Sequence, residues 1–117
     1  MKRLIFISFL LLALTSCKKE DIYDEPGYAI GKITKSISAF SAIVYYYEYE
    51  VGTTTYKGNK KRVDILTSGS SVVGLHFLVV YKLSEPSKSD LNFRYPIFSE
   101  QEFLDLVAGF QNNPPKP

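Results

Sequence analysis

The sequence has little of what enzymes use for catalysis or metal binding. Its 117 residues include one cysteine, Cys17, and one histidine, His76. A single cysteine excludes an intramolecular disulfide framework. His76 lies in the most apolar stretch of the chain, where we expect a structural histidine of a sheet and not a metal ligand. Neither a phosphate-binding glycine loop nor a nucleophile–base pattern occurs, so we predict no enzymatic activity, cofactor or metal.

The sequence also lacks an apolar run long enough for a transmembrane helix. The run from Leu4 to Leu14 has 11 residues, whereas a helix needs about 20 to cross a bilayer. It follows the cationic start Met1-Lys2-Arg3, and small residues come after it. This arrangement is typical of a secretory signal peptide. We therefore predict that residues 1–16 are removed.

The end of this segment, Leu14-Thr15-Ser16-Cys17, resembles the lipobox of bacterial lipoproteins. The resemblance implies that the Cys17 thiol receives a diacylglycerol, that cleavage occurs just before it, and that the new amino terminus is acylated. The membrane would then be a partner through the acyl chains on Cys17. We expect a lipid-anchored protein of the cell envelope, at the outer membrane.

The mature chain has almost no net charge. Lys2 and Arg3 account for two of the 14 Lys and Arg residues, so 12 remain against 12 Asp and Glu. Binding to nucleic acid depends on an excess of positive charge that neutralises phosphates. We therefore expect no nucleic-acid partner.

Residues 17–27 are polar and end in a Pro-Gly breaker, which predicts a lipidated tether. Fully extended, such a segment reaches roughly 30–35 Å. Its first residues, Lys18-Lys19-Glu20-Asp21, resemble the surface-export signal of Bacteroidota lipoproteins. That resemblance implies a domain displayed on the outer face of the cell. If the segment is only a spacer, the domain can face either side of the outer membrane.

The segments that follow predict strands. Composition favours a strand over Tyr28–Ile37. Between Ser41 and Val51 the odd positions are apolar or aromatic and the even positions become acidic, which indicates a half-buried strand. Gly52-Thr53 can form a two-residue hairpin turn. The resulting register would pair Tyr49 with Tyr56 and Glu48 with Lys57.

The second half of the chain predicts two further strands. Leu75–Leu83 is nearly unbroken apolar sequence, typical of a central strand covered on both faces. The composition of Ser84–Asp90 predicts a turn. The alternating residues after it indicate an edge strand in which one face carries Leu91, Phe93, Tyr95 and Ile97.

A helix is expected near the C-terminus. Ser99-Glu100-Gln101-Glu102 is a capping-box pattern, with Phe98 and Phe103 spaced for a hydrophobic staple. The apolar stripe of this helix would consist of Phe103, Leu106, Val107 and Phe110. Residues 111–117 are polar and rich in proline, so we predict a disordered tail.

Together these patterns predict a mainly β domain over residues 28–110, a small antiparallel barrel or sandwich of four to six strands with one C-terminal helix. Its strand and turn residues resemble those of small β-domain lipoproteins of unknown function in Bacteroidota. The resemblance implies a fold but supplies no catalytic residues. It rests on Tyr47–Gly52, Tyr56-Lys57-Gly58, Val73-Gly74, Phe77–Tyr81, Pro86, Ser89 and Leu91.

Two functions remain open from the sequence. One is a protein-interaction or structural module that binds an unknown envelope protein. The other is a receptor for a glycan or small ligand, with Tyr46 as a stacking platform beside Glu48 and Glu50. Tyr46 distinguishes them, because its ring either is exposed beside the two carboxylates or packs under a neighbouring element.

Overall fold

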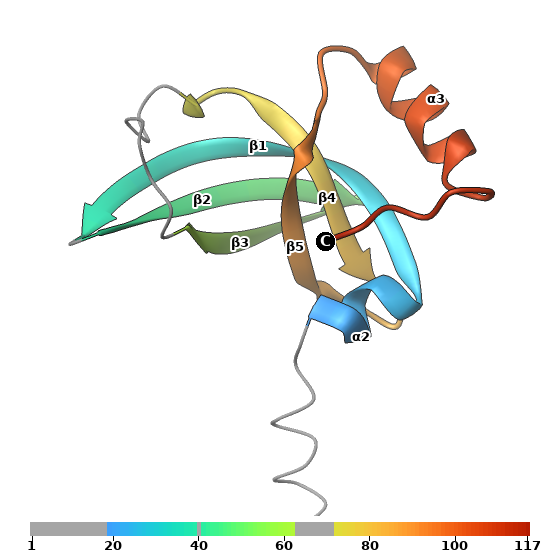
Figure 1. The fold of residues 1–117 in the computed structure, drawn as a ribbon, viewed down its shortest axis with the longest axis horizontal. Coiled ribbons are helices and arrows are strands. Elements are labelled where there is room, and N and C mark those ends of the chain that lie inside the picture. Colours follow the sequence, from blue (N-terminus) through green and yellow to red (C-terminus); the bar gives the residue numbers. More distant parts are fainter. Residues whose placement is uncertain (1–18, 40, 63–71) are drawn as a thin grey trace, which may run out of the picture.

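A curled antiparallel sheet forms the body of the protein, with a helix at each end of the described chain (Figure 1). The computed structural model describes residues 19–39, 41–62 and 72–117. Within them the sheet has five strands in the order β3-β2-β1-β4-β5. The predicted mainly β fold is confirmed, as a half-barrel. Its elements are α2 (Lys19–Asp24), β1 (Pro26–Ala39), β2 (Ala42–Val51), β3 (Thr54–Arg62), β4 (His76–Lys82), β5 (Glu85–Pro96) and α3 (Glu100–Gly109).

The inner, concave face of the sheet carries the larger core. The odd positions of β2 supply four of its buried side chains, as the alternation in the sequence predicts. Tyr49 stacks on Tyr56 with ring centroids 5.6 Å apart, and Tyr45 meets Phe93 edge-on at 5.0 Å. Aromatic pairs in these geometries add about 0.5–1.5 kcal/mol each beyond their buried area. The buried members are Ala29, Ile33, Ile43, Tyr45, Tyr47, Tyr49, Phe77, Val79 and Leu91.

The β2–β3 hairpin has the predicted register. Tyr49 lies opposite Tyr56, and Glu48 lies opposite Lys57. Gly52 has φ of 64°, the left-handed value that a two-residue hairpin turn requires at its first position. The predicted hairpin, including its turn, is therefore confirmed.

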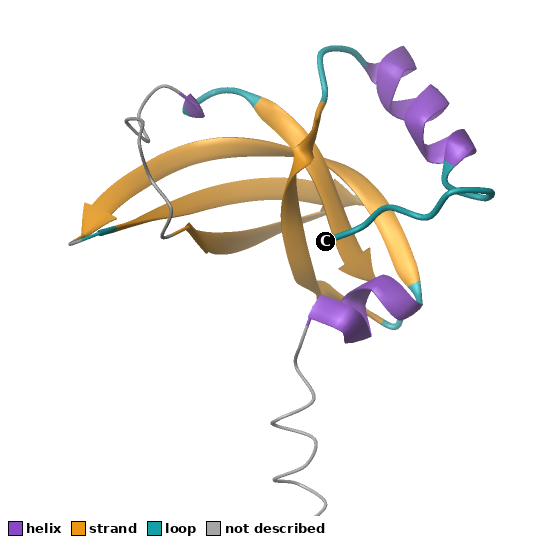
Figure 2. Ribbon diagram, in the orientation of Figure 1, coloured by secondary structure: helices purple, strands orange, loops and turns teal. Residues whose placement is uncertain are grey.

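Strand β4 is covered on both faces, as its continuous apolar sequence predicts. Phe77 and Val79 belong to the inner core. On the outer face a second cluster buries Leu78 and Val80 together with Ile22 of α2 and Phe110 after α3. The two helices are therefore what covers the outer face of the sheet. Figure 2 shows both in purple on the right of the view, α3 above and α2 below.

The prediction that residues 17–27 form a tether is wrong for residues 19–27. Residues 19–24 form α2, and β1 begins at Pro26. Ile22 is buried against the outer face of β4. The carboxylate of Asp21 accepts a hydrogen bond from Lys82 Nζ at 2.8 Å, which lowers the pKa of Asp21. Apolar burial and this ion pair attach the segment to the domain in spite of its polar composition.

Strand β5 also differs from the prediction. The turn covers only Leu83 and Ser84, and the strand already begins at Glu85. A bulge interrupts its pairing with β4, because Phe77 faces Pro96 while the next residue, Leu78, faces Asn92. This bulge turns the end of β5. Consequently Phe93 joins the inner core, whereas Tyr95 packs on Phe110 outside, with centroids 5.4 Å apart.

Helix α3 begins where the capping pattern predicts. The Ser99 hydroxyl accepts a hydrogen bond from the Glu102 backbone N–H at 3.1 Å. The predicted apolar stripe faces the outer cluster, and Phe110 is its buried member. The staple is not formed, because the Phe98 side chain is 78% exposed. The helix is therefore held mainly through its C-terminal half.

The prediction of a disordered tail over residues 111–117 is also wrong. The segment returns from α3 to the outer side of β5, where the chain ends (Figures 1 and 2). Asn92 Nδ2 donates a hydrogen bond to the carbonyl of Lys116 at 2.8 Å, and Arg94 Nε donates one to Pro117 O at 3.2 Å. Pro115 is buried. The tail thus holds α3 against the outer face of the domain.

Candidate functional site

The outer face of β1 and β2 carries the side chains that the sequence nominates for ligand binding. Glu50 is exposed and Glu48 is half-buried, with an ion pair of 3.9 Å to Lys57. Tyr46 is 37% exposed, and Lys35 Nζ lies 5.8 Å from the centre of its ring. The ring is therefore partly covered by a cation. The two glutamates share a hollow of which Tyr46 is not a part.

This hollow lies between α3 and the outer face of β1 and β2 and has a volume of about 510 Å³. Glu48, Glu50 and Thr55 line one end of it. Phe103 and Leu104 of α3 form its apolar wall, and His76 lies at the other end. The hollow therefore has carboxylates from both β2 and α3 beside the apolar wall that Phe103 and Leu104 form.

Two smaller hollows continue this depression past His76. One of about 200 Å³ shares Ile30, His76 and Glu100 with the large hollow. The next, of about 180 Å³, adds Leu75 and Pro96 and shares Phe98 with its neighbour. We call the three together the His76 trough. Its apolar rim is unusually open, because Leu75 is 45%, Leu104 53% and Phe98 78% exposed.

The position of His76 differs from its sequence-based interpretation. It is exposed at the first residue of β4, where it pairs with Lys32 of β1, and its backbone carbonyl accepts a hydrogen bond from Ile97 N at 2.9 Å. The buried residues of this strand start one residue later, at Phe77. Among the described residues no group of three or more His, Cys, Asp and Glu side chains is arranged to hold a metal.

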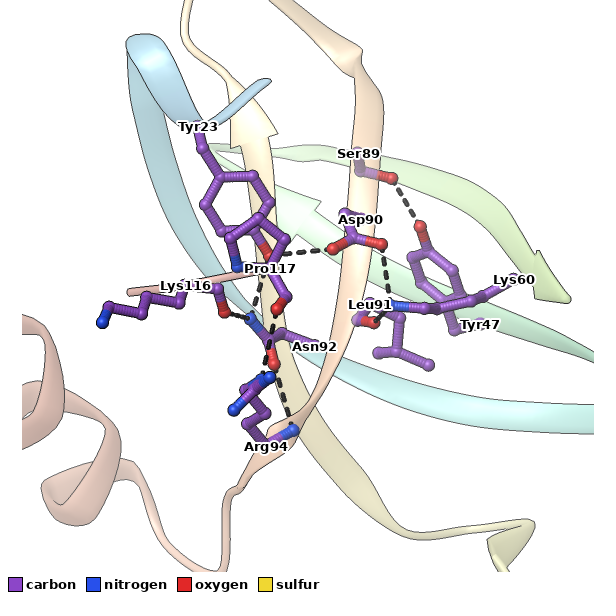
Figure 3. Close-up of polar contacts among 10 residues, drawn as sticks. All are labelled: Tyr23, Tyr47, Lys60, Ser89, Asp90, Leu91, Asn92, Arg94, Lys116 and Pro117. Carbon is purple, nitrogen blue, oxygen red and sulfur yellow. Dashed lines mark hydrogen bonds and ion pairs between the residues drawn. The ribbon is translucent and has the colours of Figure 1, made fainter. Parts of the chain in front are cut away.

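A second polar site joins the two edges of the sheet. No backbone hydrogen bond connects β3 to β5 in the described segments; the two edges meet through side chains. Lys60 Nζ reaches from β3 to Asp90 Oδ1 at 2.9 Å and to the Leu91 carbonyl at 2.6 Å (Figure 3). The Asp90 side chain is 5% exposed and that of Lys60 16%. This buried ion pair bridges the seam of the half-barrel.

The same site attaches α2 and the tail to the sheet. The Tyr23 hydroxyl donates to Asp90 Oδ2 at 2.8 Å and accepts from Asn92 Nδ2 at 2.9 Å (Figure 3). Burial, together with the Asp90 carboxylate, raises the pKa of the Tyr23 phenol. Asn92 also bonds the Lys116 carbonyl, so the network connects four parts of the chain. We call it the seam network: Tyr23, Lys60, Asp90, Leu91, Asn92 and Lys116.

Two inner tyrosines also reach the edge of β5. The Tyr49 hydroxyl donates to the Pro86 carbonyl at 2.6 Å, and the hydroxyls of Tyr47 and Ser89 lie 2.7 Å apart. Burial raises the pKa of the Tyr47 phenol. The Tyr47 ring packs over Gly58, and only glycine leaves room for it, since a Cβ at position 58 would lie 2.5 Å from the ring. Throughout the described residues, every buried side-chain nitrogen and oxygen has a hydrogen-bond partner. The seam network thus has a structural role, since it connects the two edges of the sheet.

Sequence reasoning missed both the trough and the seam network. The sequence contains one signal for the packing of α2: Ile22 and Tyr23 are the apolar residues of an otherwise polar segment. Asp90 lay in a stretch whose composition indicates a turn, although it directly precedes the apolar Leu91. The trough joins residues from five strands and α3, a juxtaposition that no local pattern encodes.

The predicted anchor and export residues are only partly within the described chain. Cys17 and Lys18 lie outside it. Lys19 and Glu20 fall in α2, and Asp21 pairs with Lys82. No helix of the described residues is long and apolar enough to cross a membrane.

Comparison with known proteins adds no assignment: no protein-family model, curated protein or solved structure matches this chain.

Proposed function

We propose that this chain is a non-enzymatic lipoprotein of the bacterial envelope, anchored to the outer membrane through acyl chains on Cys17, whose β domain binds another protein. The observation that carries the proposal is Leu14-Thr15-Ser16-Cys17 directly after an 11-residue apolar run. Two or three acyl chains provide stable attachment, whereas one chain gives only marginal binding.

The position of α2 supports a specific arrangement at the membrane. Since α2 starts two residues after Cys17, the backbone between them can span at most about 7 Å. The Glu25 carbonyl accepts from Leu83 N at 3.0 Å, so α2 and the β4–β5 turn lie at the same end of the domain. The domain therefore rests near the headgroups at this end.

The outer-face geometry favours a protein partner over a glycan. A sugar site built on Tyr46 would need its free ring face next to the two carboxylates. Lys35 instead lies over that ring, and Glu48 and Glu50 belong to a hollow with exposed apolar walls. Exposed apolar side chains that share one depression are typical of protein-binding surfaces.

Replacing the anchor should release the protein from the membrane. We expect Cys17→Ala to shift the protein from the membrane fraction to the soluble fraction and to abolish incorporation of a radioactive fatty acid. Cys17→Ser is a second variant that keeps a polar side chain of similar size. Wild-type protein that is unlabelled and soluble would contradict the proposal.

Surface display is expected from the charged residues after the anchor. Protease added to intact cells should digest the wild-type domain, because the domain faces outward. Replacing Lys18, Lys19 and Glu20 by alanine should protect it without preventing acylation; Asp21 is kept because it pairs with Lys82. A wild-type domain that resists protease until the outer membrane is opened would place it on the periplasmic side.

A further inference from the structure

Three of the seven large apolar side chains that are exposed in the described residues lie on the rim of the His76 trough. Leu75, Phe98 and Leu104 come from three separate segments, yet all three line the same depression. Single exposed apolar residues are common on any protein, but a contiguous group in a concave surface indicates an interaction site.

Helix α3 presents part of its apolar surface to this trough. None of its residues is fully buried, and Phe103, Leu106 and Val107 are half-buried against the outer cluster. Leu104 lies beside this stripe and lines the hollow at 53% exposure. The helix therefore forms a wall whose apolar side chains remain available to a ligand.

The charged residues of the trough indicate which charge its ligand carries. Glu48, Glu50 and Glu100 line the trough together with Lys32, and Glu48 also pairs with Lys57 at 3.9 Å, so three carboxylates face two ammonium groups. The first turn of α3 contains one further acidic residue, Glu102, and its last turn has no basic residue. Complementary charges guide association and exclude like-charged partners. An occupant with positive charge at one end and apolar side chains at the other matches this distribution.

The trough is accessible in the anchored protein. Lys82, at the end of β4, pairs with Asp21 of α2, whereas His76 begins the same strand. Six residue steps of a strand span about 20 Å. Figure 1 shows the connection from β5 to α3 at the end of β4 opposite to α2. The His76 end of the trough thus lies away from the anchored end.

From these observations we infer that the His76 trough binds a segment of a partner protein that has lysine or arginine at one end and bulky apolar residues at the other. The basic end lies against Glu48 and Glu50, and the apolar end packs on Phe98 and Leu75, with Leu104 between the two ends. This inference rests on the proposed protein-binding function and specifies the partner's chemistry.

A designed peptide tests the site directly. The full chain with Cys17→Ser, which removes the acylation site, is titrated into a fluorescent peptide with lysines in its first half and leucine and phenylalanine in its second. We expect saturable binding, weakened about tenfold by Leu104→Ser and by Phe98→Ser, as for central apolar contacts. Leu83→Ser is the matched control, because Leu83 is 58% exposed at the opposite end of β4 and should leave affinity unchanged.

The charge requirement has its own variants. Glu48→Gln with Glu50→Gln should weaken the peptide about threefold and reduce the salt dependence of binding. A peptide with glutamates in place of lysines should not bind. Absence of binding, equal affinity for both peptides, or full affinity in Leu104→Ser would overturn the inference. So would a dimer of the chain that Leu104→Ser dissociates, since a second copy would then occupy the trough.

Photo-crosslinking in cells separates this inference from the proposed function. A photoreactive amino acid at position 98 should give a discrete protein adduct, and one at position 83 should not. Adducts from other positions but none from position 98 would retain the protein-binding function and reject the trough. No adduct from any exposed position would reject both.

Discussion

Replacing Lys60 by methionine should lower the free energy of unfolding by about 3–5 kcal/mol, the cost of removing one partner of a buried ion pair. The variant leaves the Asp90 carboxylate, at 5% exposure, without its cation. It also removes the hydrogen bond to the Leu91 carbonyl that joins the two edges of the sheet. Methionine has a similar length, so the loss reflects the charge and the hydrogen bonds and not a cavity.

Lys57→Met on the same strand is the control. Its partner Glu48 is 3.9 Å away, and the two side chains are 78% and 42% exposed. Exposed pairs of this kind contribute about 0–1 kcal/mol. Urea denaturation followed by circular dichroism measures both variants. Equal midpoints for Lys60→Met and Lys57→Met would show that the seam network does not stabilise the half-barrel.

The second large effect is expected in the segment whose composition indicates a spacer. Ile22→Asp should destabilise the domain by about 3 kcal/mol, because it removes a buried apolar side chain and places a charge against Leu78 and Val80. In a true tether the same substitution would have no effect on folding.

Asp24→Ala is the matched control within α2, because Asp24 is exposed. A surface substitution of this kind changes stability by less than about 0.5 kcal/mol. Thermal unfolding of the two variants beside the wild type gives the comparison. If Ile22→Asp unfolds at the wild-type temperature, α2 is not part of the folded domain and the anchor is not held close to it.

The elements that the sequence predicts correctly are those whose signals are local. The β2–β3 hairpin follows from alternation over ten residues and a glycine at the turn, and both act between neighbours in sequence. The start of α3 follows from Ser99, which bonds a backbone N–H three residues later. Central strand β4 follows from its unbroken apolar sequence.

The errors occur where distant residues decide the outcome. Residues 85–90 have the composition of a turn, yet they extend as a strand whose Pro86 carbonyl and Asp90 carboxylate bond Tyr49 and Lys60. The bulge opposite Phe77 and Leu78 moves Tyr95 to the outer face, although simple alternation assigns it to the inner one. Tertiary hydrogen bonds therefore override local propensity here.

In the candidate site, too, local sequence predicts some residues and distant contacts determine the others. Glu48 and Glu50 are correctly placed on the outer face of β2 by alternation. Their companions Glu100 and Leu104 come from α3, about fifty residues later in the chain, and the return of the tail to β5 keeps that helix in place. The packing of α3 therefore determines which side chains line the hollow beside the two glutamates.

The central claim is that the mature protein begins at an acylated Cys17 directly before the folded domain. Mass spectrometry of the amino-terminal peptide from membrane-extracted protein tests it most directly. The account predicts a peptide that starts at Cys17 and carries the mass of a diacylglycerol and an amide-linked fatty acid. An amino-terminal peptide that starts at another residue, or an unmodified Cys17, would contradict it.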